Sequence, residues 1–366
     1  MLIAGLGAND TLLWGMTAEE RLRRIAHKQG LELAAPGEAA PLLANLRYAW
    51  DPSWVGFVKA RPGHVVTCGG VPVLAHVADA SQRAAVAGAM ERGAPPEDAG
   101  GLILVPQETT DLANNELRKR ERPFMDRLTP ETVPSLERAS YFGAYKGVTD
   151  ILTKYLWPEW ALALTRLAAR IGATPNMVTA LGASLCVVAT ILFYYGWYWT
   201  GLAAGLAFMV LDTVDGKLAR CTITSSWWGN IFDHGIDLVH PPFWWYAWGV
   251  GLAAYGRPLD GDTFRWVMIV IVGGYVVQRL IEGIFLRLFK MHIHVWRRFD
   301  SRFRLITARR NPNMVILFLA LLLGRPDTGL VAVAVWTVLS LLVHMVQLIQ
   351  ALAVRARGGA VTSWLS

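Results

Sequence analysis

The sequence predicts a multi-pass α-helical membrane protein that carries a small α/β domain at its N-terminus. Of its 366 residues 54% are hydrophobic and only 17% are charged, which is more apolar than an ordinary soluble chain of this length. The apolar residues are also unevenly placed, since residues 1–155 have a mixed composition and residues 174–356 hold nearly all long apolar runs. We therefore expect a cytosolic α/β domain at 1–140, a linker with a surface helix at 141–173 and a membrane domain at 174–356.

The elements of the α/β domain follow from capping and strand patterns. Thr17 followed three residues later by Glu20 has the form of a capping box and predicts a helix over Thr17–His27. Short β-rich runs bounded by turn residues predict strands. The other expected elements are strands at Val65–Thr67 and Val71–His76 around the Cys68-Gly69-Gly70 turn, a strand at Leu102–Val105, and a helix at Ser81–Arg92.

Six apolar runs in the membrane domain are candidate transmembrane helices, because each crossing needs about 20 residues. The fifth run is short and has to borrow flanking residues. Ahead of the first run, residues 156–172 place apolar and Arg residues at helical spacing, which predicts an amphipathic helix on the membrane surface. The six runs lie at 174–196, 198–222, 229–255, 263–289, 312–325 and 328–354.

Basic residues follow the second, fourth and sixth runs, whereas the turns after the other three carry few. This asymmetry predicts that both termini and the loop after the second run are cytoplasmic, in the inner (plasma) membrane. The formal net charge of +7 is interpreted as a signal of orientation, so no nucleic-acid partner is expected. We also expect no cleaved signal peptide.

Four carboxylates, Asp212, Asp215, Asp233 and Asp237, lie at the ends of the second and third runs. Each costs roughly 2.5–3.5 kcal/mol inside a membrane, so a neutralising cation is expected. Spacings of three and four residues put each pair on one helix face, and a polar loop between the pairs would bring both faces together. Oxygen ligands suit Mg²⁺, Mn²⁺ or Ca²⁺ better than Zn²⁺, and four carboxylates could hold two ions about 3.5–4 Å apart.

Small residues and an arginine follow the first acidic pair. Gly216 and Ala219 allow a helix or ligand to approach the backbone closely, and Arg220 supplies a permanent positive charge suited to phosphate. Together with Gly229 and the second acidic pair, they indicate a metal-bound diphosphate at the membrane surface.

This arrangement resembles the signature of the CDP-alcohol phosphotransferases (CDP-alcohol phosphatidyltransferases), D-x2-D-G-x2-A-R-x8-G-x3-D-x3-D. The resemblance extends over about 145–355, and Thr174-Pro175-Asn176 with Thr179 is similar to the family's first-span opening. All eight fixed positions match, at Asp212, Asp215, Gly216, Ala219, Arg220, Gly229, Asp233 and Asp237.

The resemblance implies transfer of the substituted phosphate of a CDP-alcohol to an acceptor hydroxyl with release of CMP, in phospholipid or polyol-phosphate synthesis. It implies Asp237 as the base that deprotonates the acceptor, two Mg²⁺ or Mn²⁺ ions, and a homodimer formed through the membrane domain. Metal ligands are expected at Asp212, Asp215, Asp233 and Asp237, and donor contacts at Asp212, Asp215, Thr179, Gly216, Ala219 and Arg220.

Charges beyond the signature are candidates for the acceptor pocket. Arg279 and Glu282 lie three residues apart in the fourth run, where they are either functional or a structural ion pair. Arg309 and Arg310 precede the fifth run, where they either hold a phosphate on the acceptor or anchor the helix. Three histidines are expected to have no ligand role, with His292 and His294 solvated and His344 packed.

The N-terminal domain resembles the nucleotidyltransferase-like domain that one bacterial branch of this family joins to its membrane domain. The matching stretches are Leu13–Arg21, Gly69–His76 and the lead-in Lys146–Asp150. An active nucleotidyltransferase would have a basic residue in the glycine-rich loop after its first strand, and Ala4–Asp10 has none. We therefore expect a degenerate, non-catalytic domain.

Two other functions remain open for the whole chain. One is a catalytically silent membrane scaffold whose N-terminal domain binds a partner or nucleotide. In such a protein, mutational drift would have removed part of the signature. The other is a cation transporter, although a transporter places its charges near mid-membrane in broken helices, and these charges lie at helix ends.

Overall fold

The computed structural model describes residues 1–35, 37–96, 100–114 and 117–365, which fall into two compact units. The α/β unit contains Met1–Tyr145, Thr165–Thr174 and Lys217–Ser225. The helical unit contains Lys146–Leu164, Pro175–Gly216 and Ser226–Ser366. The two units are described separately, and the predicted domain limits at 140 and 173 stay predictions.

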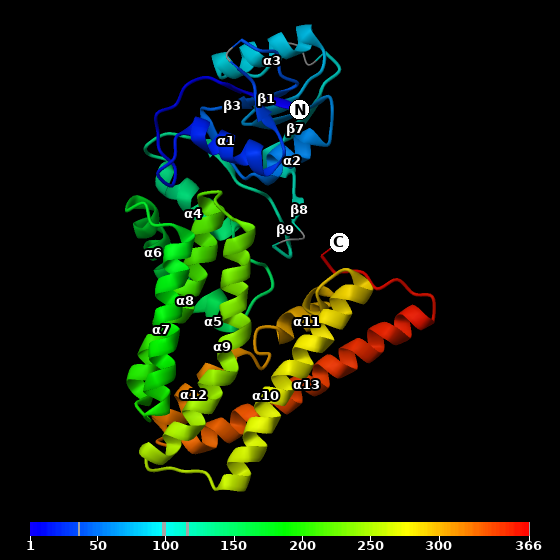
Figure 1. Ribbon diagram of the computed structural model, residues 1–366. Helices are drawn as coiled ribbons and strands as arrows, with labels where there is room; N and C mark the ends of the chain where they lie inside the picture. The colour runs from blue at the N-terminus through cyan, green and yellow to red at the C-terminus, as the bar shows by residue number, and fades with distance from the viewer. Residues whose placement is uncertain (36, 97–99, 115–116, 366) are drawn as a thin grey trace. The chain divides into compact units, whose positions relative to one another are not determined.

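A six-stranded mixed sheet forms the centre of the α/β unit (Figure 1). β1 pairs in parallel with β2 and β3, β5 pairs in parallel with β7, and β6 is antiparallel to both β3 and β5. The expected hairpin around the Gly69–Gly70 turn is therefore present. The strand order is β2 (Glu32–Leu33), β1 (Leu2–Leu6), β3 (Leu42–Asn45), β6 (Val71–His76), β5 (His64–Cys68) and β7 (Ile103–Pro106).

Helices and two small strand pairs surround this sheet. Thr17 caps the first helix by accepting the N–H of Glu20, as expected, but the Glu20 carboxylate bonds Arg23 and Arg24, so ion pairs replace the other half of the predicted capping box. The helices are α1 (Ala18–Lys28), α2 (Ser53–Lys59), α3 (Ala80–Arg92), a short 3-10 turn (Gln107–Thr109) and α4 (Val133–Gly143). The strand pairs are β4 (Tyr48–Trp50) with β10 (Met125–Arg127), and β8 (Leu112–Asn114) with β9 (Lys119–Glu121).

An apolar core holds α3 against the sheet. Val86 and Met90 of α3 pack with Leu43, Val65 and Ala75 from the strands, and all five side chains are buried. Burial of each such side chain contributes about 1.5–3 kcal/mol. This core explains why the β-rich runs predicted from the sequence fold as one sheet.

The α/β unit also includes the turn that follows the signature arginine. Arg24 of α1 donates a hydrogen bond to the Thr222 carbonyl at 2.8 Å, and the Lys217 ammonium lies 3.0 Å from the centroid of the Tyr145 ring. Residues 217–225, at and after the end of α8, therefore belong to the α/β unit.

A helix lies at every predicted apolar run and at the predicted surface helix, and all of these helices belong to the helical unit except for the last residues of α6 and α8. Among the described residues, α7, α10 and α13 are long and apolar enough to cross a membrane, and α12 is a shorter apolar helix. Six crossings therefore stay a prediction. The elements are α5 (Ile151–Tyr155), α6 (Pro158–Arg170), α7 (Pro175–Tyr194), α8 (Tyr198–Cys221), α9 (Trp227–Ala254), α10 (Gly261–Phe289), a 3-10 turn η2 (Ile293–Val295), α11 (Arg298–Phe303), α12 (Arg310–Leu322) and α13 (Pro326–Ala356).

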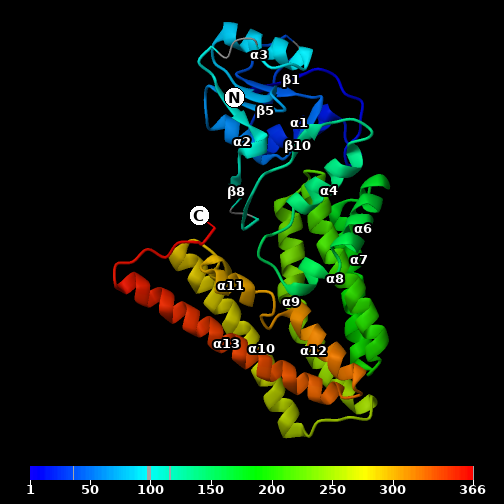
Figure 2. The same cartoon turned by 180° about the vertical axis from the view of Figure 1, so that it is seen from behind.

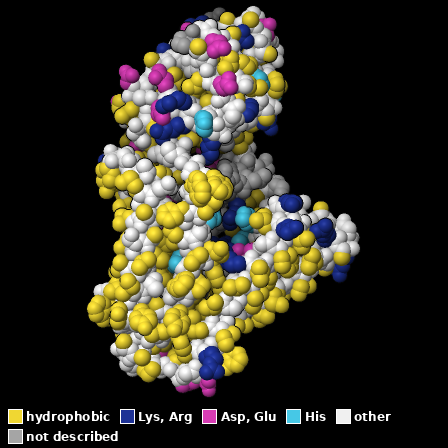
Figure 3. Space-filling view, viewed as in Figure 1, with side chains coloured by type: hydrophobic (Ala, Val, Ile, Leu, Met, Phe, Trp, Pro, Cys, Tyr) yellow, Lys and Arg dark blue, Asp and Glu magenta, His cyan; other side chains and the backbone are white. Residues whose placement is uncertain are grey.

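Three helix pairs organise this unit. α7 packs on α9, α10 runs along α13, and α12 also packs on α13 (Figure 2). Trp244 and Trp248 of α9 are fully buried, and their indole N–H groups donate to the carbonyls of Cys186 and Pro326. Hydrophobic side chains spread over the helix faces that Figure 3 displays, as expected for helices in contact with lipid.

Candidate metal and active centre

Three of the four predicted aspartates converge in the helical unit. Asp212 of α8 and Asp233 and Asp237 of α9 each offer a carboxylate oxygen, and the three oxygens lie within 4.8 Å of one another. We call these three residues the acidic centre. The spacing argument anticipated this convergence, because four residues separate Asp233 from Asp237 on one face of α9.

The fourth aspartate, Asp215, has other partners. It is buried, its Oδ2 lies 2.6 Å from the Thr179 hydroxyl, and its Oδ1 accepts the N–H of Gly216. The Thr179 hydroxyl also lies 3.0 Å from the Pro175 carbonyl. Asp215 therefore ties α8 to the start of α7, and its expected role as a metal ligand stays a prediction.

Arg310, expected in the acceptor pocket, reaches into the acidic centre. Its Nη2 lies 2.6 Å from Asp212 Oδ2, and its Nη1 lies 2.7 Å from Asp237 Oδ1. The guanidinium also stacks on Phe208, with 4.9 Å between Cζ and the ring centroid. Three carboxylates against one guanidinium leave an excess of negative charge, so the acidic centre remains suited to a divalent cation.

Two prolines interrupt α9 directly after Asp237. Pro241 and Pro242 lie inside the helix and have no N–H to donate to the carbonyls of Asp237 and Leu238, four residues before them. The hydroxyl of Tyr275 in α10 donates to the Leu238 carbonyl at 2.9 Å. A side chain from the neighbouring helix therefore replaces one of the lost backbone hydrogen bonds beside the acidic centre.

A second polar cluster surrounds Glu282, for which the sequence left either a functional role or a structural ion pair open. We call Arg279, Glu282, His294, Arg309 and His344 the glutamate cluster. Arg309 Nη2 lies 2.5 Å from Glu282 Oε2, and Arg279 Nη1 lies 3.1 Å from the same oxygen. Arg309 is thus held by Glu282, whereas its neighbour Arg310 is held by the acidic centre.

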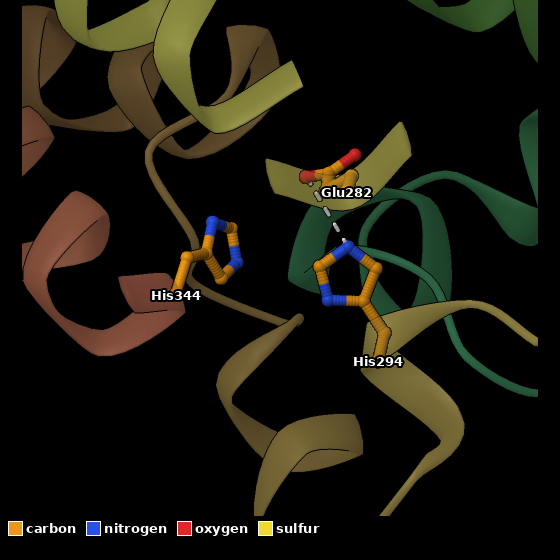
Figure 4. Close-up of side chains that lie close together, drawn as sticks. All are labelled: Glu282, His294 and His344. Carbon is orange, nitrogen blue, oxygen red and sulfur yellow. Dashed lines mark ion pairs between the residues drawn. The ribbon is translucent and has the colours of Figure 1, made fainter. Parts of the chain in front are cut away.

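The histidine expectations are partly wrong. His294 is 2% exposed rather than solvated, because the η2 turn carries it into the unit, where its Nε2 lies 3.5 Å from Glu282 Oε1. His292 is exposed and His344 is buried, as expected. Figure 4 shows Glu282, His294 and His344 pointing toward one another from α10, η2 and α13.

The two histidines and Glu282 have the side-chain types of a metal site, and their ligand atoms lie within 4.8 Å of one another. Arg309 Nη2, however, contacts both Glu282 and, at 3.2 Å, His294 Nε2. A guanidinium therefore occupies the point between these ligands. With Arg279 also on Glu282, the cluster carries an excess of positive charge and suits a divalent cation less than the acidic centre does.

The remaining signature residues lie around the connection from α8 to α9. Ala219 and Arg220 are in the last turn of α8, and the Ala219 carbonyl accepts the N–H of Thr224 at 2.8 Å. Ser226 caps α9 by accepting the N–H of Gly229. A Cβ on Gly229 would lie 3.2 Å from Asn176 Oδ1, so a larger residue there would press against the side chain of Asn176 in α7.

Sequence reasoning missed the residue that fixes the start of α12. The Asn311 amide donates to Asp150 Oδ1 at 3.0 Å, and Asp150 also caps α5 through the N–H of Thr153. Burial alone would raise the pKa of Asp150, but Arg304 and these hydrogen bonds outweigh it and hold the pKa below its ordinary value. The sequence does contain a signal for this residue, because Asp150 is the last residue of the Lys146–Asp150 stretch that resembles the family.

Comparison with known proteins identifies the segment that contains the acidic centre. Residues 173–322 match the family model described as CDP-alcohol phosphatidyltransferase. This segment of the chain is therefore similar to that family. The matched segment spans α7 to α12 and includes the acidic centre, Asp215 and the glutamate-cluster residues Arg279, Glu282, His294 and Arg309.

Curated relatives match parts of the chain. Cholinephosphotransferase 1 of Danio rerio is 38% identical over 19% of this chain and 21% of its own length. Choline/ethanolaminephosphotransferase 1 of Arabidopsis thaliana is 34% identical over 38% and 36%. Phosphatidylinositol phosphate synthase of Cutibacterium acnes is 33% identical over 21% and 40%. The matches thus span about a fifth to two fifths of the relatives' length.

One solved structure also resembles the chain. It is the phosphatidylinositol phosphate synthase of Mycobacterium tuberculosis with CDP-DAG bound, with 17% sequence identity and a TM-score of 0.41, covering 51% of this chain and 92% of that one.

Proposed function

We propose that this chain is an integral-membrane transferase that moves a substituted phosphate from a CDP-alcohol to an acceptor hydroxyl and releases CMP, in phospholipid or polyol-phosphate synthesis. The observation that carries the proposal is the convergence of Asp212, Asp233 and Asp237 inside the segment that matches the family model. In the reaction the acceptor oxygen forms a bond to phosphorus, the bond from phosphorus to the CMP oxygen breaks, and the acceptor proton passes to a base.

The acidic centre fits Mg²⁺ or Mn²⁺, because its converging ligand atoms are all carboxylate oxygens. Asp212, Asp233 and Asp237 would hold the metal, with Asp215 as the fourth expected ligand. The bound ions would offset the negative charge on the diphosphate as CMP leaves. The Arg310 guanidinium pairs with Asp212 and Asp237. It would therefore have to shift when cations bind to these carboxylates.

Asp237 is the residue we assign as general base. Its side chain is 44% exposed, more than that of Asp212 at 17% or Asp233 at 28%. Arg310 engages its Oδ1, which orients the carboxylate and leaves Oδ2 to accept the acceptor's proton. A positioned base of this kind contributes roughly 10²–10⁴-fold to rate.

Donor and acceptor are assigned to different sides of the acidic centre. Gly216, Ala219 and Arg220 on α8, with Thr179 on α7, are proposed to hold the cytidine and diphosphate. Arg310 is proposed to meet the acceptor, supported by Arg279, Glu282 and Arg309. Because Arg309 and Arg310 bond different carboxylates, they do not form a joint phosphate clamp, which favours a neutral acceptor hydroxyl such as that of diacylglycerol.

The same proposal includes the setting of the enzyme. Six helices cross the inner membrane, both termini and the acidic centre face the cytoplasm, and two copies pair through the helical unit. The N-terminal domain is proposed to be a non-catalytic relative of nucleotidyltransferases. The basic segments after α8, α10 and α13 support this orientation.

The test is release of CMP by the purified full-length chain with Mg²⁺ or Mn²⁺. CDP-choline and CDP-diacylglycerol serve as donors, and diacylglycerol, glycerol phosphate and inositol phosphate as acceptors. We expect CMP release with one donor, dependence on the divalent ion and a preference for the unphosphorylated acceptor. No release with any pair would favour a silent scaffold, and ion flux into proteoliposomes without release would favour a transporter.

A further inference from the structure

A basic pocket lies in the helical unit outside both polar clusters. It has a volume of about 360 Å³ and is lined by residues 147–149, Lys154, Arg298, Ser301, Arg302, Leu305 and Trp364. Its walls come from the segment that leads into α5 and from α11. Among these described lining residues none is acidic, so the pocket combines three cationic side chains without a carboxylate.

The three cations have no carboxylate partner among the described residues. Lys154 and Arg298 make only ring contacts, with Tyr155 at 5.4 Å and with Trp364 at 5.5 Å. Arg302 is exposed and forms no ion pair in the described part of the chain. Like charges gathered at one site repel unless an anion joins them, so the arrangement calls for an anionic ligand.

The acidic residues next to the pocket are already engaged elsewhere. Asp150, adjacent to Thr149, accepts from Thr153 and Asn311. Asp300, adjacent to Ser301, is fully buried, and Arg297 and Gln347 donate to it. Neither carboxylate is free to neutralise Lys154, Arg298 or Arg302.

Exposed apolar side chains stand on the same two short helices. Ile151 and Tyr155 of α5 are 38% and 66% exposed, and Phe299 of α11 is 57% exposed. Apolar side chains beside cations suit the membrane interface, where the former enter the acyl region and the latter meet headgroup phosphates. A soluble phosphate would use the cations but give no role to these apolar neighbours.

We propose that this pocket binds the headgroup phosphate of an anionic phospholipid, with Lys154, Arg298 and Arg302 as its cationic contacts and Trp364 closing one side. The site differs from the one proposed for donor and acceptor, since it contains no residue of the acidic centre or the glutamate cluster. It connects to the centre through Asp150, whose carboxylate holds Asn311 beside Arg310. The proposal does not depend on the transfer reaction.

The test measures retention of phosphatidylglycerol and phosphatidylcholine by the detergent-purified full-length protein, using native mass spectrometry. We expect tighter binding of phosphatidylglycerol, and a loss of roughly tenfold or more in its affinity in the triple variant Lys154→Gln/Arg298→Gln/Arg302→Gln. The matched control is Arg287→Gln/Lys290→Gln/Arg357→Gln, which removes the same charge from exposed positions of the same unit. The control should lose less than about threefold.

Unchanged melting temperature and CMP release in the pocket variant would show that its fold is intact. Equal losses in both triple variants would overturn the proposal, because they would show only diffuse attraction to anionic lipid. Equal retention of the two lipids by the wild type would also overturn it. Displacement of phosphatidylglycerol by inorganic phosphate alone would identify a soluble phosphate as the ligand and overturn the assignment to a lipid.

Discussion

The acidic centre and the glutamate cluster both combine carboxylates with arginines but have opposite charge balance. The first sets three carboxylates against Arg310, and the second sets Glu282 against Arg279 and Arg309. Consecutive residues, Arg309 and Arg310, supply one guanidinium to each. A charged residue in a membrane-domain helix therefore does not reveal its role by type alone, and the balance of charge around it decides between a cation site and a structural network.

The largest difference between the two clusters is expected at Asp237. Asp237→Asn keeps the shape but removes the base, so CMP release should fall roughly 10²–10⁴-fold while CDP-alcohol binding is retained. Asp262→Asn, the same change at an exposed position, should have no effect. Loss of donor binding in the Asp237 variant would show that the metal-holding role of Asp237, and not its role as base, accounts for the lost activity.

A substitution in the glutamate cluster should mainly lower the folding stability of the protein. Glu282→Gln leaves Arg279 and Arg309 without their carboxylate, which should cost about 3–5 kcal/mol and lower the melting temperature in detergent. Adding Arg309→Gln should recover part of the loss, and Glu91→Gln, at an exposed site, should change nothing. If the Glu282 variant melts normally but loses transfer, the cluster acts in acceptor binding instead.

Lowering the pH should also distinguish the two clusters, because the glutamate cluster contains the buried His294. Burial lowers the pKa of His294 well below its usual value, against the opposing effect of Glu282. Below the unfolded-state pKa of about 6.5, the unfolded chain therefore binds a proton that the folded chain does not.

The contribution of His294 to the free energy of unfolding is therefore constant above a pH of about 6.5. Below that pH the free energy of unfolding falls by about 1.4 kcal/mol per pH unit. The measurement compares melting temperatures from pH 7.5 down to about 5 in the wild type and in His294→Gln. The variant should show a shallower decline, and parallel curves would contradict a neutral His294.

The smallest expected effect is on metal affinity. Arg310→Gln removes a positive charge from the acidic centre, so Mn²⁺ should bind roughly fivefold more tightly, as measured by the electron paramagnetic resonance signal of free Mn²⁺. Arg309→Gln serves as the control, because its side chain lies on Glu282. Weaker Mn²⁺ binding in the Arg310 variant would mean that Arg310 organises the ligands rather than competing with the ion.

The sequence predicted contacts made within one helix or across one turn. Asp233 and Asp237 lie on the same face of their helix however the helices pack against one another. Thr17 caps α1 by accepting the N–H of a residue only three positions away. The link from Arg310 to Asp212 spans 98 residues, and no local pattern encodes it. His294 was misjudged for the same reason, since its burial depends on the packing of η2 against α10 and α13.

Strands show the same limit. The hairpin of β5 and β6 was predictable from its turn glycines, whereas every residue of β3 is buried, so β3 lacks the alternation that marks a half-buried strand. The donor and metal assignments likewise depend on the signature, whose residues are local, and not on the surrounding pocket.

The paired prolines of α9 have a mechanical consequence. Asp233 and Asp237 precede them, and the buried tryptophans Trp244 and Trp248 follow. A helix with interrupted backbone hydrogen bonds bends most easily at that point, so its acidic half can tilt without repacking its tryptophan half. The hydroxyl of Tyr275 donates a hydrogen bond to the Leu238 carbonyl, and this bond opposes bending of α9 at the prolines. The half of α9 that carries Asp233 and Asp237 is therefore the half that can shift while the tryptophan half stays in place.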